Sequence, residues 1–424
     1  MKNDKPTATL ESGKKIERVF RTVTRRKVLS GGVAATAALA APAFLHKTAE
    51  AATGPIKIGL PTVVTGGYAE LGSHVIRTSK LVANMVNGSG GILGRQIEFV
   101  VADTQGDPAA AVRKTQELVE RHGCHLITGV IVSSEARAIM PKLKEWDTLF
   151  VSHGNGDGRL TTPKFLVPNF FRANVSAPMG ARALALYLKD DPAKDYIAVG
   201  SDYAWGQSSV KAFDEQISKL GKQLVDRIMT PVGNKDFATY ITKVMRSGAK
   251  GCYVALQGDE ARAFYTQATQ YGLAAKMPLY TEIVSQSNIK ALGKSAAGLV
   301  GGSRYAYTQD TPQNKAFVQA FTKAHPGQLP DWTDGEIYQA LAVLFAGMKK
   351  ANSAEPDALV EALEDLEVTS IKGAIKIRKC DHQGMNPGIV VKVVDGPHGA
   401  APEIVKIYSR EVATPDCGKT TFSS

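Results

Sequence analysis

From Ile56 onward, the sequence alternates short apolar runs with longer amphipathic segments, and this alternation limits the fold more than any other feature. The apolar runs, such as 96–102, have the length of strands, and the segments between them have helical periodicity. Strands that alternate with helices predict βαβ units and therefore parallel sheets. Two such series follow one another, near 55–172 and 176–304, so we expect two α/β lobes of comparable size.

Polar residues mark the starts of two helices in the first series. Asp107 is a good N-cap, and Pro108 suits the first helical position after it. Ser133 and Ser134 are expected to cap the helix that follows the apolar run 126–131. Two parallel-sheet lobes also imply a cleft between them, where small-molecule sites usually form. Further helices are expected at 313–325, 334–351 and 355–364, with a few strands beyond 370.

The net charge of +11 is distributed unevenly along the 424 residues. Residues 1–51 supply +6 of it, and in the remainder basic residues are interspersed with acidic ones, as in Lys189-Asp190-Asp191. A nucleic-acid partner would favour a continuous basic stripe, which the sequence lacks. We therefore expect a small-molecule ligand and no nucleic acid.

The first 51 residues have the three parts of an export signal. A long basic region ends in Arg25-Arg26, a weakly apolar run follows at 28–45, and Ala49-Glu50-Ala51 offers the small-x-small pattern of a cleavage site. This order resembles a twin-arginine signal. We expect cleavage after Ala51 and a mature protein in the periplasm; an uncleaved membrane anchor is the alternative.

The four cysteines fall into two pairs by their surroundings. Cys124 and Cys252 each stand at the start of a predicted apolar strand, where buried free thiols are the simpler expectation. Cys380 and Cys417 both lie in the irregular C-terminal region, and export permits disulfides. They are therefore candidates for a disulfide, although the sequence does not fix the pairing.

No catalytic motif is found in the sequence: there is no G-x-S-x-G elbow and no H-E-x-x-H. Gly293-Lys294-Ser295 resembles the end of a P-loop, but Asn288 stands where the first glycine is required. The glycine-rich stretch 88–94 follows a predicted helix and precedes a strand, which is the reverse of the dinucleotide-binding order. We expect neither an enzyme nor a bound cofactor. A periplasmic hydrolase is the alternative, and it would need a nucleophile–base pair.

Two polar clusters resemble metal or catalytic groups. His122, Cys124 and His125 stand where a helix ends and a strand begins, so alternate side chains face opposite ways and do not converge on one ion. The sequence Asp381-His382-Gln383, after Cys380, is expected to form hydrogen bonds within its loop. We therefore expect no metal site.

Motifs in a fixed order extend over about residues 55 to 395. They are Gly59-Leu-Pro-Thr62, Thr65-Gly66, Ala69-Glu-Leu-Gly72, Asn87, Gly90-Gly-Ile-Leu-Gly94, Val101-Ala-Asp103, Gly129-Val-Ile-Val-Ser133, Ser152 through Thr161, Phe171-Arg172, Tyr203-Ala-Trp205-Gly-Gln207 and Asp236-Phe237. No single motif is diagnostic, but together they resemble the branched-chain amino-acid- and amide-binding proteins of ABC importers, which have the type I periplasmic binding fold. The late Cys380-Asp-His-Gln, with Cys417, resembles a subgroup for which amino-acid, amide and aromatic-acid ligands have been proposed.

The resemblance implies a topology and a function. Two Rossmann-like parallel-sheet lobes would be joined by a hinge of three crossings, with lobe 1 at 53–173 and 306–370 and lobe 2 at 174–305 and 371–424. Hinge closure would capture a small carboxylate-bearing solute, first of all a branched-chain amino acid, for delivery to an inner-membrane ABC permease. A short amide, urea, an aromatic carboxylate, or a role as a ligand sensor are the alternatives. We expect a monomer.

The resemblance also implies ligand-binding positions in the first lobe. The hydroxyl of Ser133, with Ser134 and the free N–H groups of that helix start, would receive the ligand carboxylate. An ordinary N-cap serine is the alternative. Gly154 and Gly156 stand where the family offers backbone groups to the carboxylate and amine, and a flexible turn is their alternative.

Positions on the second lobe carry the remaining expectations. Trp205 matches a family aromatic that covers the ligand, or else belongs to the core of lobe 2. Glu282 matches the acidic partner of the ligand ammonium, or else lies at the surface; a buried carboxylate would require such a cation. Three positions depart from the family pattern: Gln257 replaces a tyrosine, Leu71 replaces an aromatic residue, with Tyr68 three residues earlier, and Val132 replaces a cysteine, so the disulfide of that cysteine cannot form. These departures leave the ligand open.

Overall fold

The computed structural model describes residues 54–396 and 399–417. Residues from Pro55 onward form one compact unit. The predicted export signal and its cleavage site after Ala51 lie outside the described residues. Within the described part of the chain, no helix combines the length and apolar character that a membrane crossing requires.

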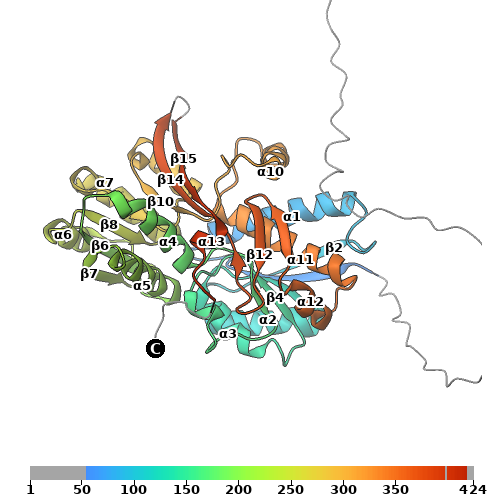
Figure 1. Cartoon of the computed structure of the whole chain (residues 1–424). Helices are drawn as coiled ribbons and strands as arrows, with labels where there is room; N and C mark the ends of the chain where they lie inside the picture. Colours follow the sequence, from blue (N-terminus) through green and yellow to red (C-terminus); the bar gives the residue numbers. More distant parts are fainter. Residues whose placement is uncertain (1–53, 397–398, 418–424) are drawn as a thin grey trace, which may run out of the picture. The chain divides into compact units, whose positions relative to one another are not determined.

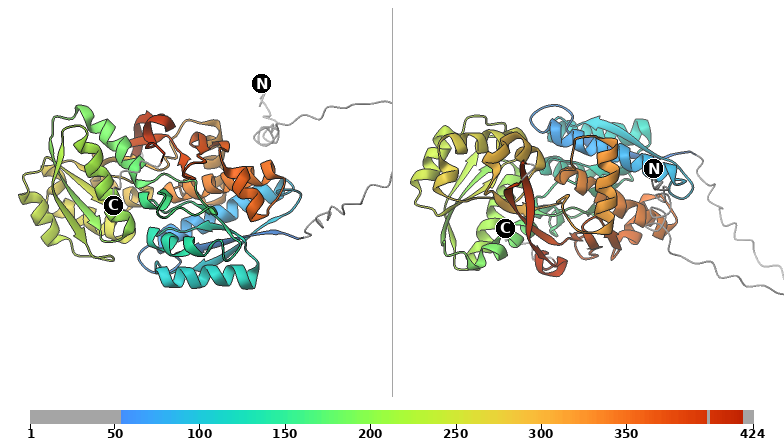
Figure 2. Two further views of the ribbon diagram at one scale, coloured as in Figure 1. Left: turned by 60° about the horizontal axis from the view of Figure 1, so that its bottom comes forward. Right: turned by 90° about the horizontal axis from the view of Figure 1, so that it is seen from above.

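The first half of the unit is built on a sheet of five parallel strands in the order β2-β1-β3-β4-β5. Helices cover both faces, as Figure 2 shows for the turquoise α2 and the orange α11 (Trp332–Ala351) on either side of the strands. The strands are β1 (Ile56–Thr62), β2 (Ile97–Asp103), β3 (Leu126–Gly129), β4 (Leu149–Ser152) and β5 (Phe170–Arg172), and the helices are α1 (Ala69–Gly88), α2 (Pro108–His122) and α3 (Ser133–Ile139).

The second sheet repeats this strand order. Its parallel strands run β7-β6-β8-β9-β10, and the antiparallel strands β14 and β15 extend it beyond β10. Helices α4 and α5 cover one face, and α6 and α7 cover the other (Figure 1). The strands are β6 (Asp195–Ser201), β7 (Gln223–Thr230), β8 (Gly251–Ala255), β9 (Leu279–Thr281), β10 (Val300–Ser303), β14 (Gly388–Gly396) and β15 (Gly399–Tyr408); the helices are α4 (Ala177–Tyr187), α5 (Ala204–Ser218), α6 (Ala238–Arg246), α7 (Gly258–Gln270), α8 (Leu273–Lys276) and α9 (Gln286–Leu292).

Successive strand residues face different cores, because side chains alternate along a strand. In β4, Val151 faces the core that includes α1 and α11, whereas Phe150 faces the core formed with α2 and α3. In β6, Ala198 joins the same core as Val151, and Val199 faces α6 and α7. One apolar core therefore takes side chains from both sheets and is continuous between the two lobes.

The segment after β10 returns to the first sheet. Helix α11 contacts α1, β3 and β4, and α12 contacts β4. Strands β11, β12 and β13 form a separate antiparallel sheet before β14 joins the second large sheet. The chain therefore passes between the lobes three times; residues 373–377 pair with β11 rather than with the second sheet, and a boundary at 370 stays a prediction. The remaining elements are α10 (Pro312–Ala324), α12 (Pro356–Leu363), β11 (Glu367–Ser370), β12 (Gly373–Ile377), β13 (Gly384–Met385), α13 (Arg410–Ala413) and short 3₁₀ helices at Met140–Lys142, Gly158–Thr161, Leu188–Asp190 and Gly293–Ala296.

The predicted fold class, two α/β lobes with parallel sheets, is confirmed. Asp107 caps α2 as expected, since its carboxylate accepts a backbone N–H of the first turn at 2.7 Å. The prediction that Ser133 and Ser134 cap α3 was wrong: the N-cap residue is Val132, and no side chain caps this helix. The hydroxyl of Ser133 instead accepts the backbone N–H groups at 156 and 157, each at 3.1 Å, which come from the loop after β4.

Cys380 and Cys417 are joined by a disulfide with a Cα–Cα distance of 6.3 Å. Cys124 and Cys252 are buried free thiols. Asp381 lies beside the disulfide, but its carboxylate is paired with Arg378, and neither sulfur of the disulfide is available as a thiolate. The disulfide therefore ties the C-terminal segment to the loop before β13.

A buried ion pair lies where the chain passes between the lobes. The ammonium of Lys372, between β11 and β12, contacts the Glu336 carboxylate of α11 at 2.8 Å, and both side chains are fully buried. The second carboxylate oxygen of Glu336 accepts the backbone N–H of Val175, between β5 and α4, at 3.2 Å. Burial raises the pKa of Glu336 and lowers that of Lys372. This pair fixes α11 to two of the three connections.

Breaking this pair on one side should be strongly destabilising. In Lys372→Met, Glu336 keeps a buried charge without its cation, so we expect the free energy of unfolding to fall by about 3–5 kcal/mol. The double variant Lys372→Met/Glu336→Gln should recover more than half of that loss, because Gln keeps an acceptor for Val175. Urea unfolding measures both. The control is Lys376→Met, whose partner Asp365 is exposed and whose loss should cost less than about 1 kcal/mol. Equal losses in the single and double variants would contradict the argument.

Candidate functional site

The carboxyl ends of the parallel strands in both sheets lead into the same region of the molecule. In both, the strand order reverses between the first and third strands of the series, and ligands of open α/β sheets bind beyond the carboxyl ends of strands at such points. Ile131 and Gly154 follow β3 and β4 of the first sheet, and Trp205 and Gln257 follow β6 and β8 of the second. The sequence therefore delivers residues from both lobes to one place.

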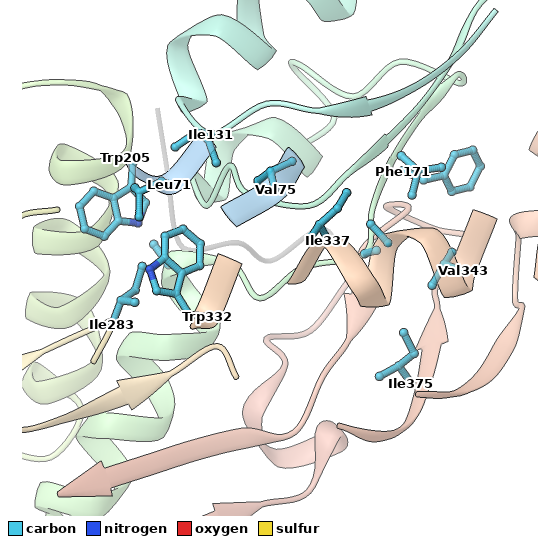
Figure 3. Close-up of a cluster of buried hydrophobic side chains, with 14 of the residues drawn as sticks. Leu71, Val75, Ile131, Phe171, Trp205, Ile283, Trp332, Ile337, Val343 and Ile375 are labelled. Carbon is cyan, nitrogen blue, oxygen red and sulfur yellow. The ribbon is translucent and has the colours of Figure 1, made fainter. Parts of the chain in front are cut away.

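A narrow cavity lies at this place, lined by residues of both lobes and of α11. Figure 3 shows the indoles of Trp205 and Trp332 at this end of the shared core, with Leu71, Ile131 and Ile283 around them. Its lining comprises Tyr68, Leu71, Ile131, Gly154, Tyr203, Trp205, Gln257, Ile283, Arg304 and Trp332. Four aromatic side chains and one arginine therefore surround the space.

Several buried polar atoms around the cavity have no protein partner. They are the indole Nε1 of Trp205 and of Trp332, the Nε of Arg304, and both amide atoms of Gln257. Buried polar groups are nearly always hydrogen-bonded, so a cluster of exceptions in one cavity indicates a ligand or water site. N–H donors outnumber acceptors in this set, which favours a ligand that carries acceptor oxygens, such as a carboxylate.

Arg304 forms the polar centre of the cavity wall. Its Nη2 donates to the Glu282 carboxylate at 2.8 Å, and its Nη1 donates to the backbone carbonyl of Gly154 at 2.8 Å. The guanidinium carbon lies 5.2 Å from the ring centroid of Trp332. Because Gly154 follows β4 of the first sheet and Glu282 follows β9 of the second, this one side chain connects the two lobes.

Glu282 is buried rather than solvated at the surface, so that alternative was wrong. Its Oε1 accepts from Arg304, and its Oε2 accepts the hydroxyl of Ser209 at 2.6 Å. The expected condition for a buried carboxylate, a nearby cation, is therefore met within the protein. Glu282 is not part of the cavity lining.

Gly156 packs directly against the polar centre. A Cβ at this position would lie 2.2 Å from Arg304 Nη2 and 2.9 Å from a ring carbon of Trp205. The absence of a side chain here is therefore what allows Arg304 and Trp205 to approach the loop after β4. Ser133 fixes the same loop through its hydroxyl, and Ser133, Ser134 and Gly156 lie outside the lining itself.

Of the residues named from the sequence, Tyr68, Gly154, Trp205 and Gln257 are brought together in the lining. Sequence reasoning missed Tyr203, Arg304 and Trp332. A signal for two of them was present: Tyr203 precedes Trp205 by two residues, and Arg304 directly follows strand β10 near a predicted crossing. Trp332 starts a helix far along the chain, and no local pattern points to it.

Direct contacts hold the lobes together around the cavity. The backbone N–H of Gly158 donates to the Ser208 hydroxyl at 2.9 Å, and Arg262 of α7 pairs with Glu70 of α1 at 2.9 Å. The hydroxyl of Tyr68 donates to Glu260 at 3.3 Å. The structure therefore has the lobes in contact across the site.

A larger hollow, of about 490 Å³, opens on the outer surface beside β7 and α6. Its Lys243 and Asp226 are paired with each other at 2.8 Å, and both are partly exposed. It lies away from the strand carboxyl ends, and none of its lining residues has a buried polar side-chain atom without a hydrogen-bond partner. The cavity between the lobes is therefore the stronger candidate, and it defines a two-lobed ligand-binding protein.

Comparison with known proteins specifies the class. The model of the periplasmic binding protein family matches residues 55–397. The chain thus belongs to the periplasmic binding protein family, as a type I member related to the branched-chain amino-acid-binding proteins; this is a family of solute-binding proteins rather than enzymes.

Similar proteins occur in several bacteria. Leu/Ile/Val-binding protein homolog 6 of Brucella suis is 28% identical over 352 residues, 80% of this chain and 88% of that protein. The leucine-, isoleucine-, valine-, threonine-, and alanine-binding protein of Pseudomonas aeruginosa is 26% identical over 77% of this chain and 86% of its own. Among solved structures, an ABC transporter substrate-binding protein from Sphaerobacter thermophilus has a TM-score of 0.77 and 27% identity, covering 84% of this chain and 98% of that chain.

A solute-binding protein from Rhodopseudomonas palustris BisB5, in complex with 3,4-dihydroxybenzoic acid, shares the fold. Its TM-score is 0.79 at 22% identity, covering 86% of this chain and 99% of that chain.

The close packing at Gly156 gives a test of the site. Gly156→Ala would place a methyl group against Arg304 and Trp205, and such overpacking should lower the free energy of unfolding by about 1–3 kcal/mol and displace the lining. The control is Gly88→Ala, where the added Cβ meets nothing within 4 Å at the end of α1. Thermal unfolding compares the two. A Gly156→Ala variant as stable as the control would contradict this packing.

Glu135, in the first turn of α3, should make stability depend on pH. Burial raises the pKa of its carboxyl from 4.5 to about 7, so the folded protein holds a proton that the unfolded chain releases. Stability should therefore fall as pH rises from about 4.5 to about 7, by up to about 3 kcal/mol. Glu135→Gln should remove this slope and stabilise the protein at neutral pH.

Urea unfolding at pH 5 and pH 8 measures this pH effect. The matched control is Glu145→Gln, since Glu145 is exposed and its carboxylate pairs with Lys142 at 3.1 Å. An unchanged slope in Glu135→Gln would show that another group carries the dependence.

Proposed function

We propose that this chain is the solute-binding component of an ABC importer and captures a small carboxylate-bearing solute between its lobes. The cluster of unpartnered N–H donors at the cavity carries this proposal. A carboxylate offers oxygens to the Arg304 Nε, the two indole N–H groups and the Gln257 amide, and so satisfies several buried donors at once. The captured solute is then delivered to an inner-membrane permease.

Hinge closure is the proposed mechanism of capture, a transition for which periplasmic binding proteins are a standard example. The three connections between the lobes, near 173, 305 and 370, are the proposed hinge. Bonds such as Gly158 to Ser208 and Arg262 to Glu70 exist only while the lobes touch, so they support a closed form that the ligand stabilises further. Proposed lobe boundaries remain 53–173 with 306–370, and 174–305 with 371–424.

The proposed roles of the site residues follow from their positions. Trp205 and Tyr68 cover the ligand body, and Gln257 and the backbone at Gly154 contact its polar groups. An indirect role is proposed for Ser133, Ser134 and Gly156: they hold the loop after β4 against Arg304 and do not contact the ligand. Glu282 acts through Arg304.

Two solute classes fit the proposal. The names of the relatives from B. suis and P. aeruginosa support a branched-chain or other aliphatic amino acid. The four aromatic side chains of the lining favour an aromatic carboxylate, since flat rings stack on such faces. We further propose that residues 1–51 direct export by the twin-arginine route and are removed, and that the periplasmic protein acts as a monomer.

A matched-ligand screen tests the proposal. A ligand that binds only the folded protein raises the melting temperature. Leucine, valine, benzoate and 4-hydroxybenzoate should include at least one that does so, whereas leucinamide, valinamide and benzamide, which lack the carboxylate, should give no shift. An amide that shifts the melting temperature as much as its acid would contradict carboxylate capture, and urea or acetamide as the best ligand would favour the amide alternative.

Gln257 should matter for binding but not for folding. Gln257→Leu removes two buried polar atoms that have no protein partner, so the ligand-free protein should be as stable as the wild type or more stable. Affinity for the ligand found in the screen should fall about tenfold, as one lost hydrogen bond to a charged group predicts. Isothermal titration measures this, with the exposed Gln116→Leu as control. Unchanged affinity would remove Gln257 from the site.

A further inference from the structure

The cavity lining contains a cation supplied by the protein and no free carboxylate. Arg304 stands between the Gly154 carbonyl and the Glu282 carboxylate, bonded to each at 2.8 Å. The sequence had led us to expect a ligand ammonium beside Glu282. In the structure the guanidinium of Arg304 occupies that place.

Both carboxylate oxygens of Glu282 already accept hydrogen bonds from the protein. Arg304 takes Oε1, and the Ser209 hydroxyl takes Oε2, with the Tyr253 hydroxyl 2.7 Å from Ser209 behind it. Gly180 packs against the other side of the Glu282 side chain, where even a Cβ would lie 2.7 Å from its Cγ. The Glu282 carboxylate is therefore buried, bonded at both oxygens and outside the cavity lining.

The other acidic groups near the cavity lie outside its lining. Glu260 accepts the Tyr68 hydroxyl and the backbone N–H of Gly233 through Oε1, and its Oε2 is buried without a hydrogen-bond partner, but Glu260 does not line the cavity. The Asp157 carboxylate pairs with Arg159, and Asp331 accepts backbone N–H groups at the start of α9 and α11. Among the described lining residues, a ligand cation would find no carboxylate, only neutral acceptors such as the amide oxygen of Gln257, and the ring faces.

We propose that Arg304 is the specificity-determining residue of this site: it takes the place of the ligand ammonium, so the site selects carboxylates that lack an amine. This inference rests on the proposed function and names its solute class. The free Arg304 Nε and the indole N–H groups of Trp205 and Trp332 receive the carboxylate, and the aromatic rings receive an uncharged, preferably flat, body. An ammonium would add a second cation beside Arg304 with no carboxylate of the lining to pair with it, which a buried site disfavours strongly.

Ligand pairs that differ by one amine test this inference. The pairs are 3-phenylpropanoate and phenylalanine, 4-methylpentanoate and leucine, and 4-methylbenzoate and 4-(aminomethyl)benzoate. For the wild-type protein, isothermal titration should show the amine-free member of a pair binding at least tenfold more tightly. Tighter binding of the amine-bearing member would overturn the inference while leaving carboxylate capture intact. Binding of no carboxylate would overturn the proposed function and this inference with it.

Two variants separate the role of Arg304 from a merely structural one. Arg304→Met leaves Glu282 without its cation, so the preference should shift by at least tenfold toward the amine-bearing member. Glu282→Gln keeps Arg304 in place, so the amine-free preference should persist. If Arg304→Met does not fold, the Glu282→Gln result decides alone: a switch to amine preference, or loss of all selectivity, would overturn the role of Arg304.

Discussion

The guanidinium of Arg304 joins groups that come from distant parts of the sequence. It bonds to the loop after β4 in the first lobe and to the residue after β9 in the second, and it faces the indole of Trp332 on α11. The packing of its neighbours depends on this side chain: Gly156 lacks a Cβ where Arg304 passes, and the Glu282 carboxylate is buried because Arg304 neutralises it. Burying either charge alone would be costly, so the pair and the contact of Arg304 with the first lobe support each other.

The sheets explain why so many polar groups converge at this point. Parallel strands all end at one edge, and both sheets place the strand order reversal at the edge facing the cavity. The residues that follow β3, β4, β6, β8, β9 and β10 therefore come together without any long-range sequence signal. The apolar side chains within the strands pack in the shared core. The site therefore lies at the end of that core, as Figure 3 shows for Trp205 and Trp332 beside Leu71.

The sequence was sufficient for the fold and for the residues next to strand ends. The alternation of strands and helices predicted both lobes. Gly154 and Trp205 were found because each follows a predicted strand within a family motif, and Tyr68 and Gln257 because they lie at or near positions where the family has an aromatic residue. The partners of buried groups could not be read in the same way. The pairing of Glu282 with a residue 22 positions later, and the use of the Ser133 hydroxyl by the loop at 156–157, depend on tertiary packing that local patterns do not encode.

The two lobes contribute different chemistry to the site. The first offers backbone groups, apolar side chains and the indole N–H of Trp332, whereas the second brings the ion pair of Arg304 and Glu282 and the amide of Gln257. A carboxylate that enters between them meets an arginine whose charge is already shared with Glu282, so the site gains directional N–H donors without a large unbalanced positive charge. In the proposed function the four aromatic side chains would set the shape of the solute, because their rings are held by the shared core. Charge balance and ring packing would then act on different ends of the same small molecule.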